Sequence, residues 1–186
     1  AAFARALQLD AGLAGDRRVQ ADYARGLAEL ARWDEAAVAL AAALPLDLPA
    51  AASDPDLHRV AALVATRRRE PAIAVRHLQV LASHRALTVD ERRWLAGQAE
   101  EAGQWTVAVA EYDRLLASGQ GRADELWQKV AELEARQGHA AAALAAWQQV
   151  SSPARDATYW RRLTWAAARV GRREALDAYA AAFAAG

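Results

Sequence analysis

The stretch that decides the fold is Leu95 to Leu116, which reads LAGQAEEAGQWTVAVAEYDRLL. Its apolar residues recur at three- and four-residue steps on both sides of Gly103, as one face of a helix requires. Glycine accepts the left-handed backbone that ends many helices, so the first helix is expected to stop at Gly103. The stretch therefore predicts two antiparallel helices joined by a turn. One such hairpin cannot bury its apolar faces alone and needs neighbours.

The hairpin pattern recurs along the chain. With Ala108 as the reference, alanines stand at comparable places with spacings of 36, 36, 35 and 32 residues, inside the range of two-helix repeats. These alanines are Ala36, Ala72, Ala108, Ala143 and Ala175. The inner turns predicted just before them are Ala31, Arg67, Gly103, Gly138 and Gly171. Two of the first helices also begin with a tryptophan, Trp127 and Trp160.

This order of residues resembles the tetratricopeptide repeat (TPR), in which Trp, Leu and a small residue precede Gly, an aromatic, Ala, an aromatic and Ala. The resemblance implies an all-α fold: a right-handed α-solenoid of about five antiparallel helical hairpins, forming a single domain over residues 1–186. Repeats are expected at residues 17–48, 54–83, 88–119, 124–153 and 157–186, after a half repeat at 1–12. Because the sequence lacks an initial methionine and a polar capping helix, a fragment of a longer protein is expected. An unrelated array of helical hairpins is the alternative.

Composition narrows the class of protein. Hydrophobic residues make up 54% of the 186 residues, and many are alanine, the best helix former. The 23 basic and 23 acidic side chains balance, which argues against nucleic acid or an anionic membrane as a partner. The absence of cysteine excludes disulfides and thiolate chemistry. No apolar run reaches the roughly 20 residues that a membrane span needs, so no direct membrane insertion is expected.

The sequence offers no constellation of residues for catalysis. It contains no nucleophile elbow, no phosphate-binding loop and no His-Glu-x-x-His motif. His77 and His84 lie seven residues apart and could share a helix face. Two imidazoles without a carboxylate or thiolate partner make a poor metal site. The chain is therefore predicted to be no enzyme and to hold no cofactor and no metal.

The TPR resemblance points instead to a binding surface. In TPR proteins the first helices line the concave side, where partners usually bind. Carried over by position, the candidate partner-binding residues are Arg93, Trp94, Lys129, Arg136, Arg161, Arg162, Trp165 and Arg169. Arg161, Trp165 and Arg169 follow a four-residue spacing, so they should project from one side of a helix. Packing against a further repeat is the alternative role for Trp165, whereas Trp127 and Trp160 are expected in the core.

These observations predict a non-enzymatic protein–protein interaction scaffold. Its richness in Ala, Leu, Arg, Trp and Gln is similar to that of the periplasmic TPR domains of exopolysaccharide export proteins, such as those for Pel, alginate or cellulose. This likeness implies a periplasmic location and a partner protein such as a polysaccharide-modifying enzyme. Two alternatives stay open. One is a surface that binds or guides polysaccharide directly, with Trp94 and Trp165 as stacking platforms; the other is a cytoplasmic TPR assembly module.

Overall fold

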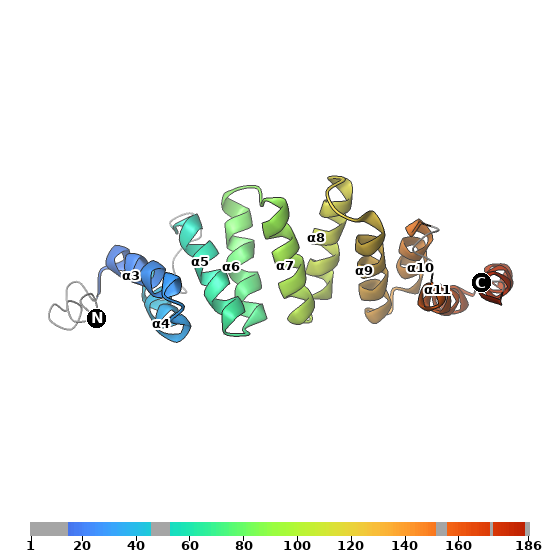
Figure 1. Ribbon diagram of the computed structural model, residues 1–186, viewed down its shortest axis with the longest axis horizontal. Helices are drawn as coiled ribbons and strands as arrows, with labels where there is room; N and C mark the ends of the chain where they lie inside the picture. The colour runs from blue at the N-terminus through green and yellow to red at the C-terminus, as the bar shows by residue number, and fades with distance from the viewer. Residues whose placement is uncertain (1–14, 46–52, 152–155, 172, 185–186) are drawn as a thin grey trace. The chain divides into compact units, whose positions relative to one another are not determined.

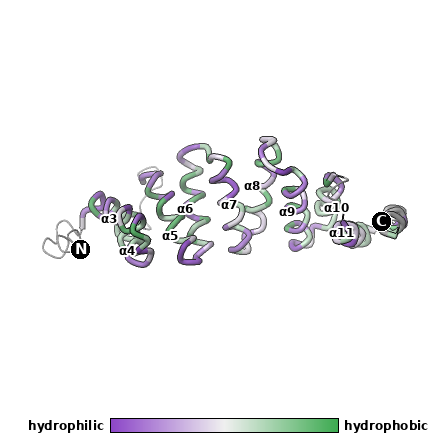
Figure 2. The backbone as a smooth tube through the Cα atoms, viewed as in Figure 1, coloured by the Kyte–Doolittle hydropathy of each residue, from purple (hydrophilic) through white to green (hydrophobic). Residues whose placement is uncertain are grey.

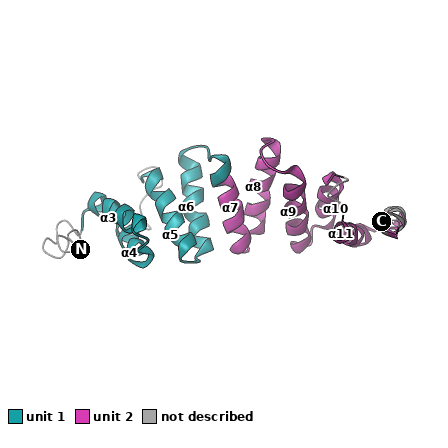
Figure 3. Cartoon of the chain, viewed as in Figure 1, with its two compact units in different colours: residues 1–91 teal, residues 92–186 magenta. Residues whose placement is uncertain are grey.

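The computed structural model describes residues 15–45, 53–151, 156–171 and 173–184. Within these ranges the chain forms ten α-helices and no strand (Figure 1). The helices follow one another along the chain with short connections, and the chain divides into two compact units, residues 1–91 and 92–186 (Figure 3). The predicted half repeat at residues 1–12 lies outside the described ranges.

Unit 1 contains two complete hairpins. The first pairs α3 (Arg17–Glu29) with α4 (Trp33–Ala43), and the second pairs α5 (Pro55–Arg67) with α6 (Pro71–His84). Helix α5 also contacts both α3 and α4, so the two hairpins share one core. The first turn of α7 (Val89–Glu101) completes this unit.

Unit 2 contains the rest of α7 and the five helices that follow it. They are α8 (Trp105–Ala117), α9 (Ala123–Arg136), α10 (Ala140–Gln149), α11 (Ala157–Val170) and α12 (Arg173–Ala184). Helix α9 packs on α8 and α10, and α11 packs on α10 and α12. Hydrophilic and hydrophobic positions alternate along individual helices rather than filling separate ones (Figure 2), as expected for helices that bury one stripe each.

The inner turn of each hairpin is built around one residue with a positive φ angle. These residues are Ala31, Arg69, Gly103, Gly138 and Gly171. In four of the turns the next N–H donates to a carbonyl five residues back, at 2.8–2.9 Å. This is the Schellman arrangement, which satisfies carbonyls that a helix end would otherwise leave unpaired. The second helix of each of these hairpins then begins without any side-chain cap.

Several first helices are capped by acidic side chains instead. The carboxylates of Asp16, Asp54 and Asp156 accept hydrogen bonds from backbone N–H groups in the first turns of α3, α5 and α11. Helix α7 starts with a capping box, in which Thr88 N–H donates to Glu91 and Glu91 N–H donates to Thr88. These caps fix where four of the hairpins begin, whereas α9 begins without a side-chain cap.

The reference alanines lie where the helices of a hairpin meet, with one correction. Ala36, Ala108 and Ala143 have no exposed surface, as small residues at a close helix contact should. In the second hairpin the prediction of Ala72 is wrong, because Ala72 is exposed and Ala74 is the buried residue. The turn residue there is Arg69 rather than Arg67, which lies in the last turn of α5. The side chain of Ala175 lies outside the described part.

The predicted all-α architecture of helical hairpins is thus confirmed for the described residues. None of the described helices has the length and apolar character needed to cross a membrane.

Candidate functional site

Four of the predicted partner-binding residues line one pocket in unit 2. The pocket has a volume of about 380 Å³ and lies mainly between the first helices α9 and α11. We call it the Arg–Trp pocket; its lining residues are Glu132, Ala135, Arg136, Trp147, Arg161, Arg162 and Trp165. Helix α9 contributes its last turns and α11 its first half, so the site depends on two consecutive hairpins being held in register.

Trp165 is the exposed aromatic side chain of this pocket. It keeps 41% of its surface accessible, although the neighbouring Ala166 and Ala167 are completely buried. The guanidinium carbon of Arg169 lies 4.6 Å from the centroid of the Trp165 ring, in a cation–π contact. Arg161, four residues before Trp165, lines the same pocket. The structure therefore places Arg161, Trp165 and Arg169 along one side of α11, as their spacing predicted.

Arg162 joins the two first helices that line the pocket. Its guanidinium donates a hydrogen bond to Glu132 of α9 and lies 5.7 Å from the centroid of the Trp147 ring. Trp147 is 2% exposed and packs edge-on against Tyr159, with 5.8 Å between ring centroids. Trp147 of α10, which pairs with Tyr159 of α11, thus packs against the Arg162 side chain in the pocket.

The pocket carries more positive than negative charge. Glu132 is the one carboxylate among its lining residues, and Arg162 already binds it. Within the described part of the chain, Arg136, Arg161 and Arg169 form no ion pair; Arg161 makes a long 3.5 Å hydrogen bond to the Thr158 hydroxyl. Exposed guanidinium groups without a carboxylate partner can bind a carboxylate or phosphate through two parallel hydrogen bonds.

The other predicted site residues do not line this pocket. Lys129 binds Glu100 of α7, at 2.9 and 3.1 Å from its two carboxylate oxygens. Glu100 also accepts a 2.8 Å hydrogen bond from the Tyr112 hydroxyl, and burial together with this carboxylate raises the pKa of Tyr112. Arg93 lies beside Gly121, where an added Cβ would stand 3.3 Å from an Arg93 nitrogen. Lys129 therefore joins α9 to α7, and Trp94 is half-buried on α7.

The two tryptophans expected in the core are half-buried rather than fully enclosed. Trp160 makes aromatic contacts with Tyr159 and with Tyr179 of α12, with ring centroids 5.0 and 6.2 Å apart. It therefore packs between helices, as the sequence predicted for Trp160.

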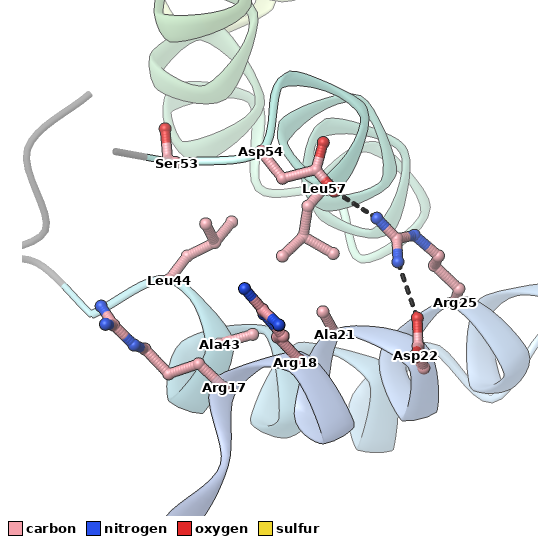
Figure 4. Close-up of a pocket in the computed structure, with 10 residues that line it drawn as sticks. All are labelled: Arg17, Arg18, Ala21, Asp22, Arg25, Ala43, Leu44, Ser53, Asp54 and Leu57. Carbon is pink, nitrogen blue, oxygen red and sulfur yellow. Dashed lines mark hydrogen bonds and ion pairs between the residues drawn. The ribbon is translucent and has the colours of Figure 1, made fainter. Parts of the chain in front are cut away.

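A second pocket lies between the first helices α3 and α5 of unit 1 (Figure 4). It has a volume of about 510 Å³, and we call it the Arg–Asp pocket; its lining residues are Arg17, Arg18, Ala21, Asp22, Arg25, Ala43, Leu44, Ser53, Asp54 and Leu57. Figure 4 shows Arg25 between Asp22 and Asp54. Arg25 donates to Asp22 at 2.8 Å and also to Asp54, so its charge is neutralised within the pocket.

Unit 1 also contains a hydrogen-bonded chain of three histidines and a serine. His58 Nε2 lies 2.8 Å from the Ser53 hydroxyl, and His58 Nδ1 lies 2.9 Å from His77 Nδ1. His84 Nε2 completes the chain at 3.3 Å from the same hydroxyl. Burial lowers the pKa of His58 and, more strongly, the pKa of His77 to about 4. Sequence reasoning noted His77 and His84 but missed His58 and Ser53, which join them from another helix and the segment before it.

This histidine chain is not arranged as a metal site. The described residues include no group of three or more His, Cys, Asp or Glu side chains that could hold a metal ion. Two of the histidines point their Nδ1 atoms at each other at hydrogen-bond distance, which leaves no room for an ion between them. The arrangement instead forms hydrogen bonds between α5, α6 and the residue that precedes α5.

Comparison with solved structures identifies the fold. The chain is similar to a MamA protein with a TM-score of 0.57 and 15% identity, over 88% of this chain and 87% of that one. It is also similar to YrrB, described as a TPR protein with an unusual peptide-binding site, with a TM-score of 0.56 and 18% identity over 94% and 86% of the two chains. Scans of protein-family models and of curated proteins give no match. The likenesses show that the chain has a TPR-type fold, as its sequence predicted.

Proposed function

We propose that this protein is a protein-binding scaffold and that the Arg–Trp pocket is its binding site for an acidic segment of a partner protein. The observation that carries the proposal is the pairing of an exposed indole, Trp165, with arginines that have no carboxylate partner in the described chain. Arg136, Arg161 and Trp165 are exposed, so their side chains are accessible to a partner.

The chemistry of the pocket favours a protein partner with carboxylates beside an apolar group. Arginine and tryptophan are the residue types that most often dominate binding energy at interfaces. The Trp165 indole offers apolar area, while Arg136 and Arg161 offer paired N–H donors on either side of the pocket. Arg169 lies over the Trp165 ring and makes the site more positive. The described peptide-binding site of YrrB supports binding of a polypeptide by the same fold.

Direct binding of polysaccharide is the second candidate, and it rests on the same exposed Trp165. A sugar ring would stack on the face of the indole, but Arg169 already lies against the ring at 4.6 Å. A neutral sugar also offers no carboxylate for the unpaired arginines to bind. Retention on immobilised neutral polysaccharide that Trp165→Ala abolishes would favour this alternative.

The cellular setting extends the proposal. We place the scaffold in the periplasm, within an exopolysaccharide export system, where it would recruit a polysaccharide-modifying enzyme; a cytoplasmic assembly module is the alternative. Composition is the support for this setting. The sequence that flanks these residues in the full gene tests it, because an upstream signal peptide is required for a periplasmic protein.

Capture of partner proteins on the immobilised chain tests the binding site. Trp165→Ala should weaken binding by about 2 kcal/mol if the indole is an anchor, which corresponds to roughly 30-fold. Arg169→Glu should weaken binding most at low salt, where screening is least. Ala141→Glu and Ala145→Glu, at exposed positions of the second helix α10, are matched controls that should bind like the parent. Loss of binding in these controls, with full binding by the Trp165 and Arg169 variants, would move the site to the second helices.

A further inference from the structure

The hydrogen bonds of the histidine chain in unit 1 constrain one another. The Nδ1 atoms of His58 and His77 lie 2.9 Å apart, so one of them must carry a proton and the other a free lone pair. His58 uses its second nitrogen for the Ser53 hydroxyl, which also meets His84. Four side chains thus form one continuous path, and each link needs one donor and one acceptor.

This path adds polar contacts to a pair of helices that already pack extensively on each other. Ser53 immediately precedes the cap of α5, His58 lies in the first turns of α5, and His77 and His84 lie on α6. The beginning of α5 is therefore tied to the second half of α6 by polar contacts, whereas their remaining contacts are mostly apolar. Removing the polar links would free the start of the α5–α6 hairpin first.

Protonation of the histidine rings disrupts this hydrogen-bonded path in two steps. A first proton places a positive charge on a buried ring, and burial disfavours that charge. A second proton on the His58–His77 pair turns both Nδ1 atoms into donors, and two donors cannot remain 2.9 Å apart. Protonation therefore does more than add charge, because it removes the acceptor on which the link depends.

The charged groups around the path do not compensate the positive charge that protonation adds to the histidine rings. Asp54 favours the charged form of His58, but it already caps α5 and binds Arg25. His84 opposes protonation of His58, and both His58 and Arg76 oppose protonation of His77. The remaining charged residues that line the adjoining pockets are Arg17, Arg18, Asp22, Arg68 and Glu70, and α4 contributes only apolar residues. Arg68 and Glu70 bind each other, and Arg68 also binds Asp34.

Protons can reach the rings from solvent. His58 and His77 line a pocket of about 460 Å³ whose other walls are mainly apolar residues of α4, α5 and α6. The rings of His58 and His77 are thus buried enough to disfavour the charged form and open enough to respond to the surrounding pH.

We propose that Ser53, His58, His77 and His84 form a proton-sensitive latch, which holds the α5–α6 hairpin closed at neutral pH and releases it in acid. The latch lies in unit 1 and is independent of the binding site proposed in unit 2. Its consequence is a scaffold whose N-terminal hairpins loosen selectively when the pH falls, for example on transfer to an acidic compartment or surface.

Hydrogen exchange of the full chain, read by mass spectrometry at pH 7 and pH 5, tests the latch. After correction for the pH dependence of chemical exchange, protection of α5 and α6 should fall about tenfold or more, while α8 and α9 in the same molecule serve as the internal reference. His77→Asn keeps a hydrogen-bonding side chain that does not titrate, so it should remove most of this fall. His139→Asn, at an exposed histidine of unit 2, is the control and should behave like the parent.

An equal fall in α5–α6 and α8–α9 would overturn the proposal, as would a parent-like fall in His77→Asn. If His77→Asn does not fold, nuclear magnetic resonance of the histidine rings in the parent gives the answer. The latch requires that His58 and His77 stay neutral at pH 6; titration of both rings near the ordinary histidine pKa of about 6.5 would contradict it.

Discussion

The Arg–Asp pocket of unit 1 and the Arg–Trp pocket of unit 2 each lie between first helices of consecutive hairpins. They differ in how many carboxylates accompany their arginines. In unit 1, Arg25 is bound by two carboxylates, Asp22 and Asp54. In unit 2, one carboxylate, Glu132, stands among three arginines. Arg25 and Glu132 each stand six residues before the positive-φ residue of their hairpin, so the sign of the charge is reversed at one repeat position.

This difference is the basis for the proposal that one pocket is structural and the other binds a partner. In the Arg–Asp pocket the two acids bind Arg25 and join neighbouring helices, whereas Arg17 and Arg18 are exposed and form no ion pair within the described residues. In the Arg–Trp pocket only one acid, Glu132, is present and the Trp165 indole is exposed, so the pocket offers both positive charge and apolar area. The position in the repeat therefore does not determine the role, and the neighbouring side chains do.

The comparison assumes that the hairpins of both units are built alike. Replacing a buried alanine with leucine in each unit tests this assumption, and it has the largest expected effect on stability. Ala74→Leu in unit 1 and Ala108→Leu in unit 2 should each cost about 1–3 kcal/mol, because both alanines are fully buried. Ala72→Leu, at an exposed position two residues away, should change stability by less than about 0.5 kcal/mol. Denaturant midpoints measure all three. A costly Ala72→Leu with a neutral Ala74→Leu would restore the register predicted from the sequence.

The first turns of α7 and α9 allow a second comparison, between an ion pair whose carboxylate is buried and one that is exposed. Arg85 donates to both carboxylate oxygens of Glu91 at 2.8 and 2.6 Å, and these contacts lower the pKa of Glu91 to about 2. Glu91→Gln should therefore destabilise the chain by about 2 kcal/mol at pH 7. Glu125 pairs with Arg122 on the surface, so Glu125→Gln should leave the denaturant midpoint unchanged.

The pH dependence of the same pair gives an independent check. Because the folded-state pKa of Glu91 lies below its ordinary value of 4.5, its contribution is present above pH 4.5 and is lost as the pH falls toward 2. The parent and Glu91→Gln should therefore converge in stability across this window. A difference that stays constant down to pH 2 would show that the ion pair does not supply the contribution.

The hairpin turns supply the smallest expected effect. Unit 1 places Ala31 and Arg69 at the left-handed turn position, whereas unit 2 places glycine there in all three hairpins. Arg69→Gly should stabilise the chain by up to about 1 kcal/mol, and Gly103→Ala should destabilise it by a similar amount. Thermal unfolding would detect both shifts. Changes of the opposite sign would mean that the loss of flexibility in the unfolded chain outweighs the backbone strain.

These turns also explain how far the sequence predicts the fold. Glycine marks the turns at residues 103, 138 and 171, and the helical periodicity around them is regular, so these hairpins are predictable. At Arg69 no residue type signals the left-handed backbone, and the prediction slipped by two residues to Arg67 and Ala72. The surrounding packing imposes that conformation, and a single sequence carries no local sign of it.

In the candidate site, the sequence predicted the side chains that share one helix face but not the contacts between helices. A four-residue spacing places Arg161, Trp165 and Arg169 on one side of a helix, whatever the neighbouring helices do. Which cations are bound by acids depends on contacts between helices, such as Lys129 with Glu100 of another helix. The histidine chain joins Ser53 and His58 to His77 and His84 across two helices, and no sequence motif records that proximity.

Charge reversal in the two pockets tests the binding claim most directly. Partner proteins are captured on the immobilised full chain, on an Arg136→Glu, Arg161→Glu double variant of unit 2, and on an Arg17→Glu, Arg18→Glu double variant of unit 1. All four residues are exposed, and the two variants change the net charge equally. The unit 2 variant should lose at least about tenfold in affinity, while the unit 1 variant stays within about twofold of the parent. Equal loss in both variants, or loss only in the unit 1 variant, would contradict the assignment of binding to the Arg–Trp pocket.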